Sequence, residues 1–350
     1  MSKVGGGWQH ITSADMVHWR IEQPFQLRWN GTERFVQAGA VGVGDDGEAF
    51  AVECSIDAPG KPSPWREGKP AQYNFYSFTN ATNNAWHDPI ALFDVYAARF
   101  YPGDPPRPFK GADGRWRAIL SFDACNSTLP THPSEAGNCS GGGSAPTWSS
   151  PALHGPQADW QYEGVLLQTN ATVLSGKRGL PLRSNRREFV TSDFFPVASH
   201  PLVNAVFVTS MYGVIVNDSN PQIKNGNWNQ LVAYVGHQPA PGAPMQLLPG
   251  APSCLDWGSF VRTTGWHGVD AATTDGLMYG IGKTMRSGPP DTGRRVLLAW
   301  MNNGFSSGAH DGRTDNNETN QILPRDALSL PRDLSFSPEG RLLQSYVPEL

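Results

Sequence analysis

Short apolar runs separated by turn-forming residues constrain this chain more than any other feature. Each run has five to seven residues, and most have Gly, Asn, Asp or Pro close by, as strands of a turn-rich β protein do. Five runs stand out: Phe50–Cys54, Arg117–Phe122, Ala205–Met211, Gln230–Val235 and Arg295–Trp300. No segment keeps the 3.6-residue apolar period of an amphipathic helix over about 12 residues. The sequence therefore predicts an all-β fold.

Composition agrees with many short strands and narrows the possible partners. The 350 residues include 38 Gly and 30 Pro, and only 17% are charged. This length is enough for one large core or two domains. A net charge of -4 gives no reason to expect nucleic acid or an acidic membrane surface as a partner. No apolar run reaches the roughly 18 residues of a membrane-spanning helix. The number of subunits is left open.

The interior of the chain has features of a secreted glycoprotein. Asn-x-Ser/Thr acceptor sequences occur more often than the composition alone would give. They begin at Asn30, Asn80, Asn126, Asn138, Asn170, Asn217 and Asn317. Residues 1–10 nevertheless contain no apolar segment typical of a secretory leader. We therefore expect a protein of the secretory pathway, extracellular or vacuolar, whose leader is missing from this sequence.

Two of the four cysteines are spaced for a local disulfide. Cys125 and Cys139 bracket a loop rich in Ser, Pro and Gly. Closing this loop of about 15 residues would contribute roughly 3 kcal/mol in the chain-entropy model. The alternative is that all four cysteines are free thiols. Since none has metal-ligand spacing, no metal site is expected.

Two Trp-containing turns suggest internal repetition. The segment Ser13–Trp19 resembles Ser150–Trp160, because both begin at Ser, contain an aliphatic residue and end at Trp. In such a turn, Ser and Asp would bond the backbone and Trp would pack between strands. Two copies favour the repeated blades of a β-propeller, the alternative being two unrelated turns.

Two long segments are expected to be surface insertions without strands, Ser55–Asp88 and Ala124–Thr147. The first contains Trp65, Tyr73, Phe75, Tyr76 and Trp86. These aromatic side chains would line a sugar subsite or form a small core beneath the loop.

Three carboxylates lie close to aromatic residues. Glu188 is in a strand-like segment, Asp193 precedes a Phe-Phe-Pro turn, and Asp104 belongs to a Gly-Asp-Pro sequence. Carboxyl groups cleave glycosidic bonds, and aromatic rings cover the apolar faces of sugars. The pattern therefore indicates sugar chemistry.

The same segments resemble glycoside hydrolase family 32, which comprises invertases, inulinases and fructan hydrolases. Trp8–Trp19 is similar to the family's Trp-Gly-His-Ala-x-Ser-x-Asp-Leu-Val-His-Trp segment, and Asp193–Val197 to the end of its Glu-Cys-Pro-Asp-Phe-Phe-Pro-Val. Further resemblances follow in the family's order at Gln37–Val41, Gly103–Pro105, Leu255–Gly258, Arg294–Trp300, Leu330–Phe336 and Leu342–Leu350.

The resemblance implies a five-bladed β-propeller followed by a β-sandwich. Residues 1–330 would form the propeller, with an incomplete first blade. Residues 331–350 would hold the closing strand and the start of a linker to the sandwich, which is absent. The family's nucleophilic Asp stands in a Trp-Met-Asn-Asp-Pro-Asn-Gly motif before the Trp-Gly-His segment, and residues 1–7 contain no such motif. We therefore expect this chain alone to be nearly inactive.

The resemblance also assigns the catalytic carboxylates. Asp104 matches the residue that binds sugar hydroxyls and stabilises the oxocarbenium-like state, although Gly103 replaces the family's Arg. The general acid is expected at position 190, which is Val190 here. Because a shift of two keeps a residue on the same strand face, a two-residue bulge would return Glu188 to the acid position. The alternatives are a turn-forming Asp104 and a solvated Glu188.

Other positions are expected to contact the substrate or to be structural. Asp193 would hold a sugar hydroxyl or order a turn, while Trp257 and Trp86 would stack on sugar or pack in the core. His10 and His18 are expected to be structural. With no phosphate-binding glycine loop and no nucleotide fingerprint, no cofactor is expected.

These observations predict a retaining β-fructosidase that acts on sucrose or fructans. One alternative is a non-catalytic carbohydrate-binding propeller, which Gly103 and the displaced Glu favour. Another is a five-bladed arabinan hydrolase, which the closing Leu-Pro-Arg-Asp-Leu-Ser match disfavours.

Overall fold

The structure is a computed structural model, and every element it describes is a β-strand. The described residues are 11–22, 28–29, 32–33, 36–43, 49–55, 72–80, 85–86, 90–94, 106–123, 143–155, 157–168, 187–197, 200–215, 226–251, 253–256, 260–262, 278–287, 294–301 and 327–350. At some strand positions, including Trp86 and Glu188, only the backbone is described. No helix occurs in these ranges, as the strand-like runs predict.

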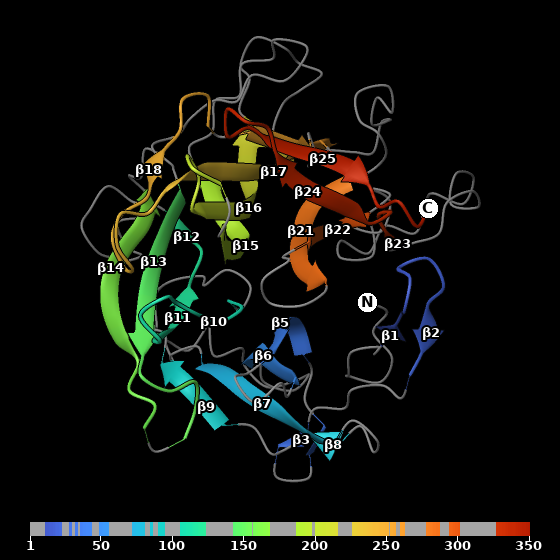
Figure 1. Cartoon of the computed structure of the whole chain (residues 1–350). Helices are drawn as coiled ribbons and strands as arrows, with labels where there is room; N and C mark the ends of the chain where they lie inside the picture. The colour runs from blue at the N-terminus through green and yellow to red at the C-terminus, as the bar shows by residue number, and fades with distance from the viewer. Residues whose placement is uncertain are drawn as a thin grey trace.

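The sheets stand around a common centre in the order of the chain (Figure 1). Strands β5 to β9, in blue and cyan, lie below the centre, and green β13 and β14 lie to the left. Yellow strands β15 to β17 lie above it, and orange and red strands β21 to β25 complete the circuit. Blue strands β1 and β2 come next to the C-terminal end. This is a β-propeller arrangement, which confirms the predicted fold class, while the number of five blades stays a prediction.

The N-terminal part forms two small hairpins and one larger sheet. One hairpin pairs β1 (Ile11–Thr12) with β2 (Arg20–Ile21), and the other pairs β3 (Arg28–Trp29) with β4 (Thr32–Glu33). The larger sheet has the order β5 (Val36–Val43), β6 (Ala49–Ser55), β7 (Gln72–Asn80) and β8 (Ala85–Trp86), and β9 (Ile90–Asp94) also pairs with β7.

The central sheet has eleven strands in two groups. The first group contains β10 (Phe109–Lys110), β11 (Trp116–Ile119), β12 (Phe122–Asp123), β13 (Gly143–Ser150) and β14 (Gln161–Gln168). The second contains β15 (Arg187–Pro196), β16 (Ala205–Ile215), β17 (Gly226–His237), β18 (Gln246–Leu247), β19 (Ser253–Asp256) and β20 (Phe260–Arg262). Among the described strands, the two groups are joined in the sheet by one register pair, Asp123 and Glu188.

The C-terminal sheet has the order β21 (Met278–Ser287), β22 (Arg294–Met301), β24 (Arg332–Phe336) and β25 (Leu342–Tyr346), and β23 (Ala327–Leu328) pairs with β22. Residues 331–350 thus supply two strands to the same sheet as β21 and β22. The division of the chain at residue 330 stays a prediction.

The core lies where neighbouring sheets face one another. One apolar cluster joins β15, β16 and β17 to the C-terminal sheet through Phe195, Val206, Val208, Leu231, Leu297 and Leu334. A second joins the first group of the central sheet to the second group through Ile119, Leu166, Phe189, Phe207 and Tyr234. Alternate residues of β16 and β17 enter different clusters, because successive side chains of a strand point to opposite faces.

The two Trp-containing turns both use side-chain oxygens to bond the backbone, as predicted. Asp15 Oδ1 accepts hydrogen bonds from the amides of Val17 and His18, at 2.9 and 2.8 Å. Ser150 Oγ accepts one from the amide of Asp159 at 2.9 Å. The predicted packing of the first Trp between strands is wrong, because Trp19 is 39% exposed and its Nε1 donates to the Met16 carbonyl.

The prediction of two strand-free insertions is wrong. Strand β7 lies within the first segment, and its Tyr73 and Tyr76 positions pair with Cys54 and Ala51 of β6. In the second segment, β13 begins at Gly143. Strand β7 mixes aromatic and polar residues, and such a composition suits a strand paired on both sides as well as it suits a binding loop.

Within the described residues, no helix is long and apolar enough to cross a membrane.

Candidate functional site

Some of the predicted site residues lie within the described part of the chain, and others lie outside it. Glu188 and Asp193 both belong to β15, and Trp86 is the last residue of β8. Outside the described residues lie Asp104, Trp257, Cys125, Cys139, Asn30, Asn126, Asn138, Asn170, Asn217 and Asn317, while Asn80 ends β7. The roles predicted for all of these residues stay predictions.

Strand β15 contains a bulge between the two carboxylate positions. Glu188 pairs with Tyr212 of β16 and Asp193 with Val208, but the register shifts between Phe189 and Ser192. Two residues of β15, Val190 and Thr191, therefore stand opposite Ser210 alone. The bulge therefore has one extra residue, whereas the predicted bulge has two.

The bulge brings positions 188 and 193 into phase. They are five residues apart along β15, which would put them on opposite faces of a regular strand. Their partners on β16 are Tyr212 and Val208, four residues apart, which is the spacing of positions on one face. The backbone of β15 thus presents both carboxylate positions to the same side of the sheet.

Asp193 is a buried carboxylate with a cationic neighbour. It is 2% exposed, and its Oδ1 lies 2.6 Å from Nη2 of Arg107. Burying a carboxylate is costly unless a charge compensates it, and Arg107 supplies an opposite charge beside Asp193. The predicted Phe-Phe-Pro turn after Asp193 is instead the end of β15.

A buried cluster of hydroxyl groups lies beside the bulge. Ser192 is hydrogen-bonded to Ser121, and its Oγ donates to Thr209 Oγ1 at 3.2 Å. All three residues are at most 3% exposed. These hydrogen bonds join the end of the first strand group to β15 and β16, and they satisfy polar groups that burial would otherwise destabilise.

Aromatic residues surround this part of β15. The ring of Phe189 lies 5.3 Å from that of Phe207 and 5.7 Å from that of Tyr234, centre to centre. The ring of Phe194 lies 4.7 Å from that of Phe109. On the other side, the Arg295 guanidinium lies 4.4 Å from the centre of the Phe195 ring.

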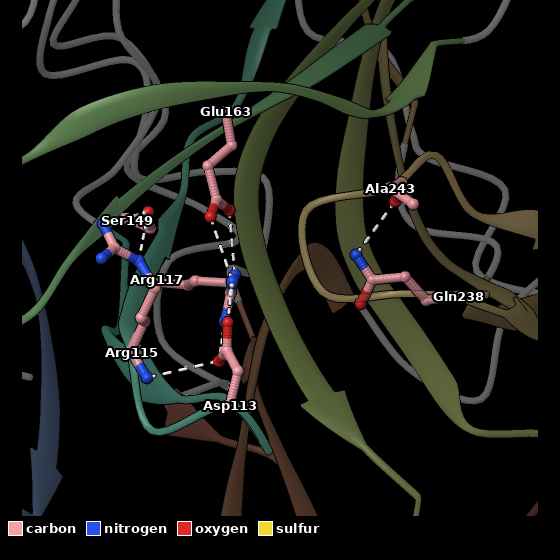
Figure 2. A network of polar contacts seen from close by, with 7 residues as sticks. All are labelled: Asp113, Arg115, Arg117, Ser149, Glu163, Gln238 and Ala243. Carbon is pink, nitrogen blue, oxygen red and sulfur yellow. Dashed lines mark hydrogen bonds and ion pairs between the residues drawn. The ribbon is translucent and has the colours of Figure 1, made fainter.

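A second polar network lies between β11 and β14 (Figure 2). Arg117, whose side chain is 3% exposed, donates from Nη1 and Nη2 to the two carboxylate oxygens of Asp113 at 2.6 and 2.7 Å. Its Nε donates to Glu163 Oε2 at 2.9 Å. The Arg117 guanidinium lowers the pKa of the Asp113 carboxyl to about 2. Arg117 has its own pKa raised, first by Asp113 and then by Glu163.

The loop after β17 passes close to this network at Gly242. Gly242 has φ of +78°, and a Cβ there would lie 2.9 Å from Glu163 Oε2, so only glycine fits without strain. Gln238 Nε2 donates to the Ala243 carbonyl at 3.0 Å and closes the loop (Figure 2). The network is structural, because it joins elements at the outer side of the strand groups and uses all three charged groups.

Two residues near the candidate site were not predicted. Arg107 follows Asp104 by three residues, and Asp123 stands opposite Glu188 in the register of β12 and β15. No local sequence pattern identifies either residue, because each lies at least 65 residues before its partner on β15. Among the described residues, no group of three or more His, Cys, Asp or Glu is placed to hold a metal ion.

Comparison with known proteins rests on the fold. No family model matches the chain, and no curated protein matches it either. A mutant of the Bombyx mori GH32 beta-fructofuranosidase BmSUC1 in complex with sucrose is similar, with a TM-score of 0.54 and 14% identity. That match covers 98% of this chain and 56% of the other.

Two further structures are similar at the same level. A fructosyltransferase from A. japonicus has a TM-score of 0.54 and 15% identity, covering 94% of this chain and 55% of the other. A thermostable family-43 glycoside hydrolase has a TM-score of 0.52 and 12% identity, covering 95% and 83%. The chain spans little more than half the length of the first two structures. The chain therefore has the β-propeller fold of the glycoside hydrolases of families 32 and 43.

Proposed function

We propose that this chain is the propeller of a retaining glycosidase of the β-fructosidase type, acting on sucrose or fructans. The observation that carries the proposal is the series of family motifs, which follow one another along the chain in the family's order. The propeller fold, shared with a beta-fructofuranosidase mutant in complex with sucrose, supports it. The bulge in β15 has one extra residue and not the two that would bring Glu188 to the acid position, so the assignment of Glu188 rests on the motif alone.

In the proposed mechanism, Glu188 protonates the glycosidic oxygen as the leaving group departs. Asp104 accepts hydrogen bonds from sugar hydroxyls, and its negative charge stabilises the oxocarbenium-like transition state.

A retaining reaction also needs a nucleophilic carboxylate about 5 Å from the acid. The family motif that carries this nucleophile, Trp-Met-Asn-Asp-Pro-Asn-Gly, does not occur in residues 1–350, so we propose that these residues bind sugar without turnover. Loss of one catalytic carboxylate lowers the rate of hydrolysis by several orders of magnitude.

The test compares the 350-residue chain with the product of the complete gene on three substrates. We expect the gene product to hydrolyse sucrose or inulin and to leave arabinan intact, and the 350-residue chain to bind the same fructosides with turnover near background. Turnover by residues 1–350 near 10 per second, an ordinary enzyme rate, would refute the assignment of the nucleophile. Sugar binding by the gene product without hydrolysis would support the non-catalytic carbohydrate-binding propeller. Hydrolysis of arabinan would support the five-bladed arabinan hydrolase.

Glu188→Gln in the active gene product tests the acid. We expect kcat to fall by about 10²–10⁴-fold on sucrose. Substrates with a good leaving group should be affected least, because they need little protonation. Glu339→Gln is the matched control, since Glu339 is exposed in the turn between β24 and β25. Equal losses in the two variants would refute the role of Glu188.

We further propose that the protein enters the secretory pathway, carries N-linked glycans and forms the Cys125–Cys139 disulfide. The seven acceptor sequences and the loop between the cysteines support this proposal. Expression in a secretory eukaryotic host, followed by peptide mapping before and after deglycosylation and reduction, tests it. Unmodified asparagines and free thiols at all these positions would refute it.

A further inference from the structure

One histidine joins two turns that belong to different sheets. His200 lies in the loop between β15 and β16, and Ser337 begins the turn between β24 and β25. The His200 Nε2 lies 3.0 Å from the Ser337 carbonyl oxygen, and its Nδ1 lies 3.2 Å from the amide nitrogen of Leu202. The imidazole also packs on the Phe336 ring, 5.7 Å away from centre to centre. The ring therefore connects a loop of the central sheet to a turn of the C-terminal sheet.

Both polar partners of His200 are backbone groups, and this fixes the protonation of the ring. The Leu202 amide can only donate, so Nδ1 accepts and carries no proton. The Ser337 carbonyl can only accept, so Nε2 donates the one proton of the ring. Together the two hydrogen bonds require a neutral imidazole. A protonated imidazole has donors at both nitrogens, so it would lose the bond to Leu202.

The β24–β25 turn lies directly on side chains beside His200. Gly340 has φ of +81°, and a Cβ there would lie 2.7 Å from Leu248 Cδ1 and 3.1 Å from Val203 Cγ2. A glycine therefore lets the turn come this close. The Gly340 amide donates to the Ser337 carbonyl at 2.9 Å, so that oxygen accepts one bond within the turn and one from His200.

The charged groups near the ring keep their charge while an imidazole titrates. The turn contains Glu339 and Arg341, both exposed. A hydrogen bond from Ser337 lowers the pKa of the Glu339 carboxyl, and an arginine stays protonated throughout. The described part of the β15–β16 loop and residues 248–251 contain no other charged or titratable side chain. Proton uptake by the ring is thus the change that mild acid makes at this contact.

We propose that His200 is a pH-sensitive latch between the β15–β16 loop and the β24–β25 turn, closed by the neutral ring and opened by protonation. The neutral ring makes both hydrogen bonds, and the protonated ring keeps only the one to Ser337. The latch is therefore closed at neutral pH and opens as the pH falls through the ordinary imidazole range, roughly pH 7.5 to 5.5. The apolar cluster that includes Val203, Leu334 and Leu342 does not titrate, so the two sheets stay packed while the latch opens.

NMR of the 350-residue chain with labelled histidine nitrogens tests the closed state. At about pH 8, where an ordinary imidazole is neutral, we expect His200 to show a protonated Nε2 and an unprotonated Nδ1. The variant His200→Gln identifies the signals by their loss. A proton on Nδ1 at this pH, or averaging between the two neutral forms, would overturn the latch.

Hydrogen exchange tests the opening. The protection of the Leu202 amide and of residues 337–341 is measured at about pH 7.5 and about pH 5.5 and corrected for intrinsic exchange. We expect protection to fall about 2- to 10-fold at the lower pH, the factor for loss of one net hydrogen bond. His200→Gln keeps a donor toward Ser337 and has no titratable ring, so its protection should not depend on pH. His237→Gln removes an exposed histidine at the end of β17 and should keep the wild-type response.

Two results would overturn the latch: equal pH responses in wild type and His200→Gln, or wild-type protection that is the same at both pH values. His200→Phe keeps a ring beside Phe336 and removes both hydrogen bonds, so its protection should be low at both pH values. This variant remains informative if His200→Gln does not fold. Protection in His200→Phe as high as in the neutral wild type would show that the hydrogen bonds of the ring do not hold the loop.

Discussion

At the scale of single residues, Arg117 shows how one buried cation organises two carboxylates. Its guanidinium is almost inaccessible to water, yet both Asp113 and Glu163 reach it from more exposed positions. An arginine fork suits this arrangement because it offers several N–H donors in one plane. Removing the cation would leave two carboxylates facing each other across a desolvated site.

The Asp113 carboxyl makes stability depend on pH. Arg117 lowers the pKa of Asp113 from 3.8 to about 2 in the folded chain. A lowered carboxyl pKa stabilises the fold above the unfolded value, and this contribution is lost as the pH falls through the folded value. We expect the difference in unfolding free energy between wild type and Asp113→Asn to be constant above about pH 5 and to shrink between about pH 4 and pH 2. Urea denaturation at each pH measures it.

The control for this effect is Asp159→Asn, which removes an exposed carboxylate. A difference between wild type and Asp113→Asn that persisted unchanged at pH 2 would show that the ion pair does not link proton binding to folding.

At the scale of elements, the contact between β13 and β15 depends on a missing side chain. A Cβ at Gly143 would lie 2.3 Å from Cδ1 of Phe189, whose ring is 1% exposed. The glycine lets the ring cross the backbone of β13 and fill the core beside Phe207. Phe189 is also the residue next to Glu188, so this packing fixes β15 at the candidate acid.

We expect Gly143→Ala to destabilise the fold by about 1–3 kcal/mol, because the new methyl group overlaps the Phe189 ring. Phe189→Leu removes the outer atoms of the ring and should make room for the alanine. In a denaturation cycle, the double variant should therefore be more stable than the sum of the two single changes predicts. Strict additivity would show that the overlap is relieved elsewhere.

The sequence predicts the strands better than it predicts their partners. Runs such as Ala205–Met211 and Gln230–Val235 are strands because β-branched and apolar residues pack on two sheet faces. Strand β7 was missed because its mixture of aromatic and polar residues fits more than one kind of environment. A bulge before Asp193 was predicted, but its size depends on pairing with β16, which no local pattern specifies. The same applies to Arg107, whose partner is 86 residues away.

At the scale of the whole molecule, the two ends of the described chain lie near each other (Figure 1). Arg294 donates to Asp333 Oδ1 at 2.6 Å and to Glu349 Oε2 at 2.7 Å. Asp15, in the first turn, is close enough to Glu349 to raise its pKa, although Arg294 lowers that pKa more strongly, to about 2. One arginine therefore offsets the mutual repulsion of carboxylates from both ends of the chain.

We expect Arg294→Gln to loosen this junction. Asp15, Asp333 and Glu349 would then repel one another, and hydrogen exchange of residues 11–22 and 342–350 should speed up together. Salt screens exposed charges, so this increase in exchange should be larger at about 10 mM than at about 500 mM sodium chloride. The two concentrations lie on either side of roughly 0.1 M, where the Debye length is about 10 Å. Acceleration in the C-terminal range alone would show that the first turn is held independently of Arg294.

The bulge in β15 determines which changes of length this strand can accommodate. A substitution at Thr191 keeps the bulge, whereas deleting Thr191 would leave Val190 alone opposite Ser210 and straighten the pairing with β16. Positions 189 and 188 would keep Met211 and Tyr212 as partners, so both would stay on their present faces of the sheet. We therefore expect the deletion variant to fold, as judged by urea denaturation. Deleting Val190 as well should prevent folding, because position 189 would move to the opposite face and the Phe189 ring would leave the core. Loss of folding on deleting Thr191 alone would show that the bulge itself is required.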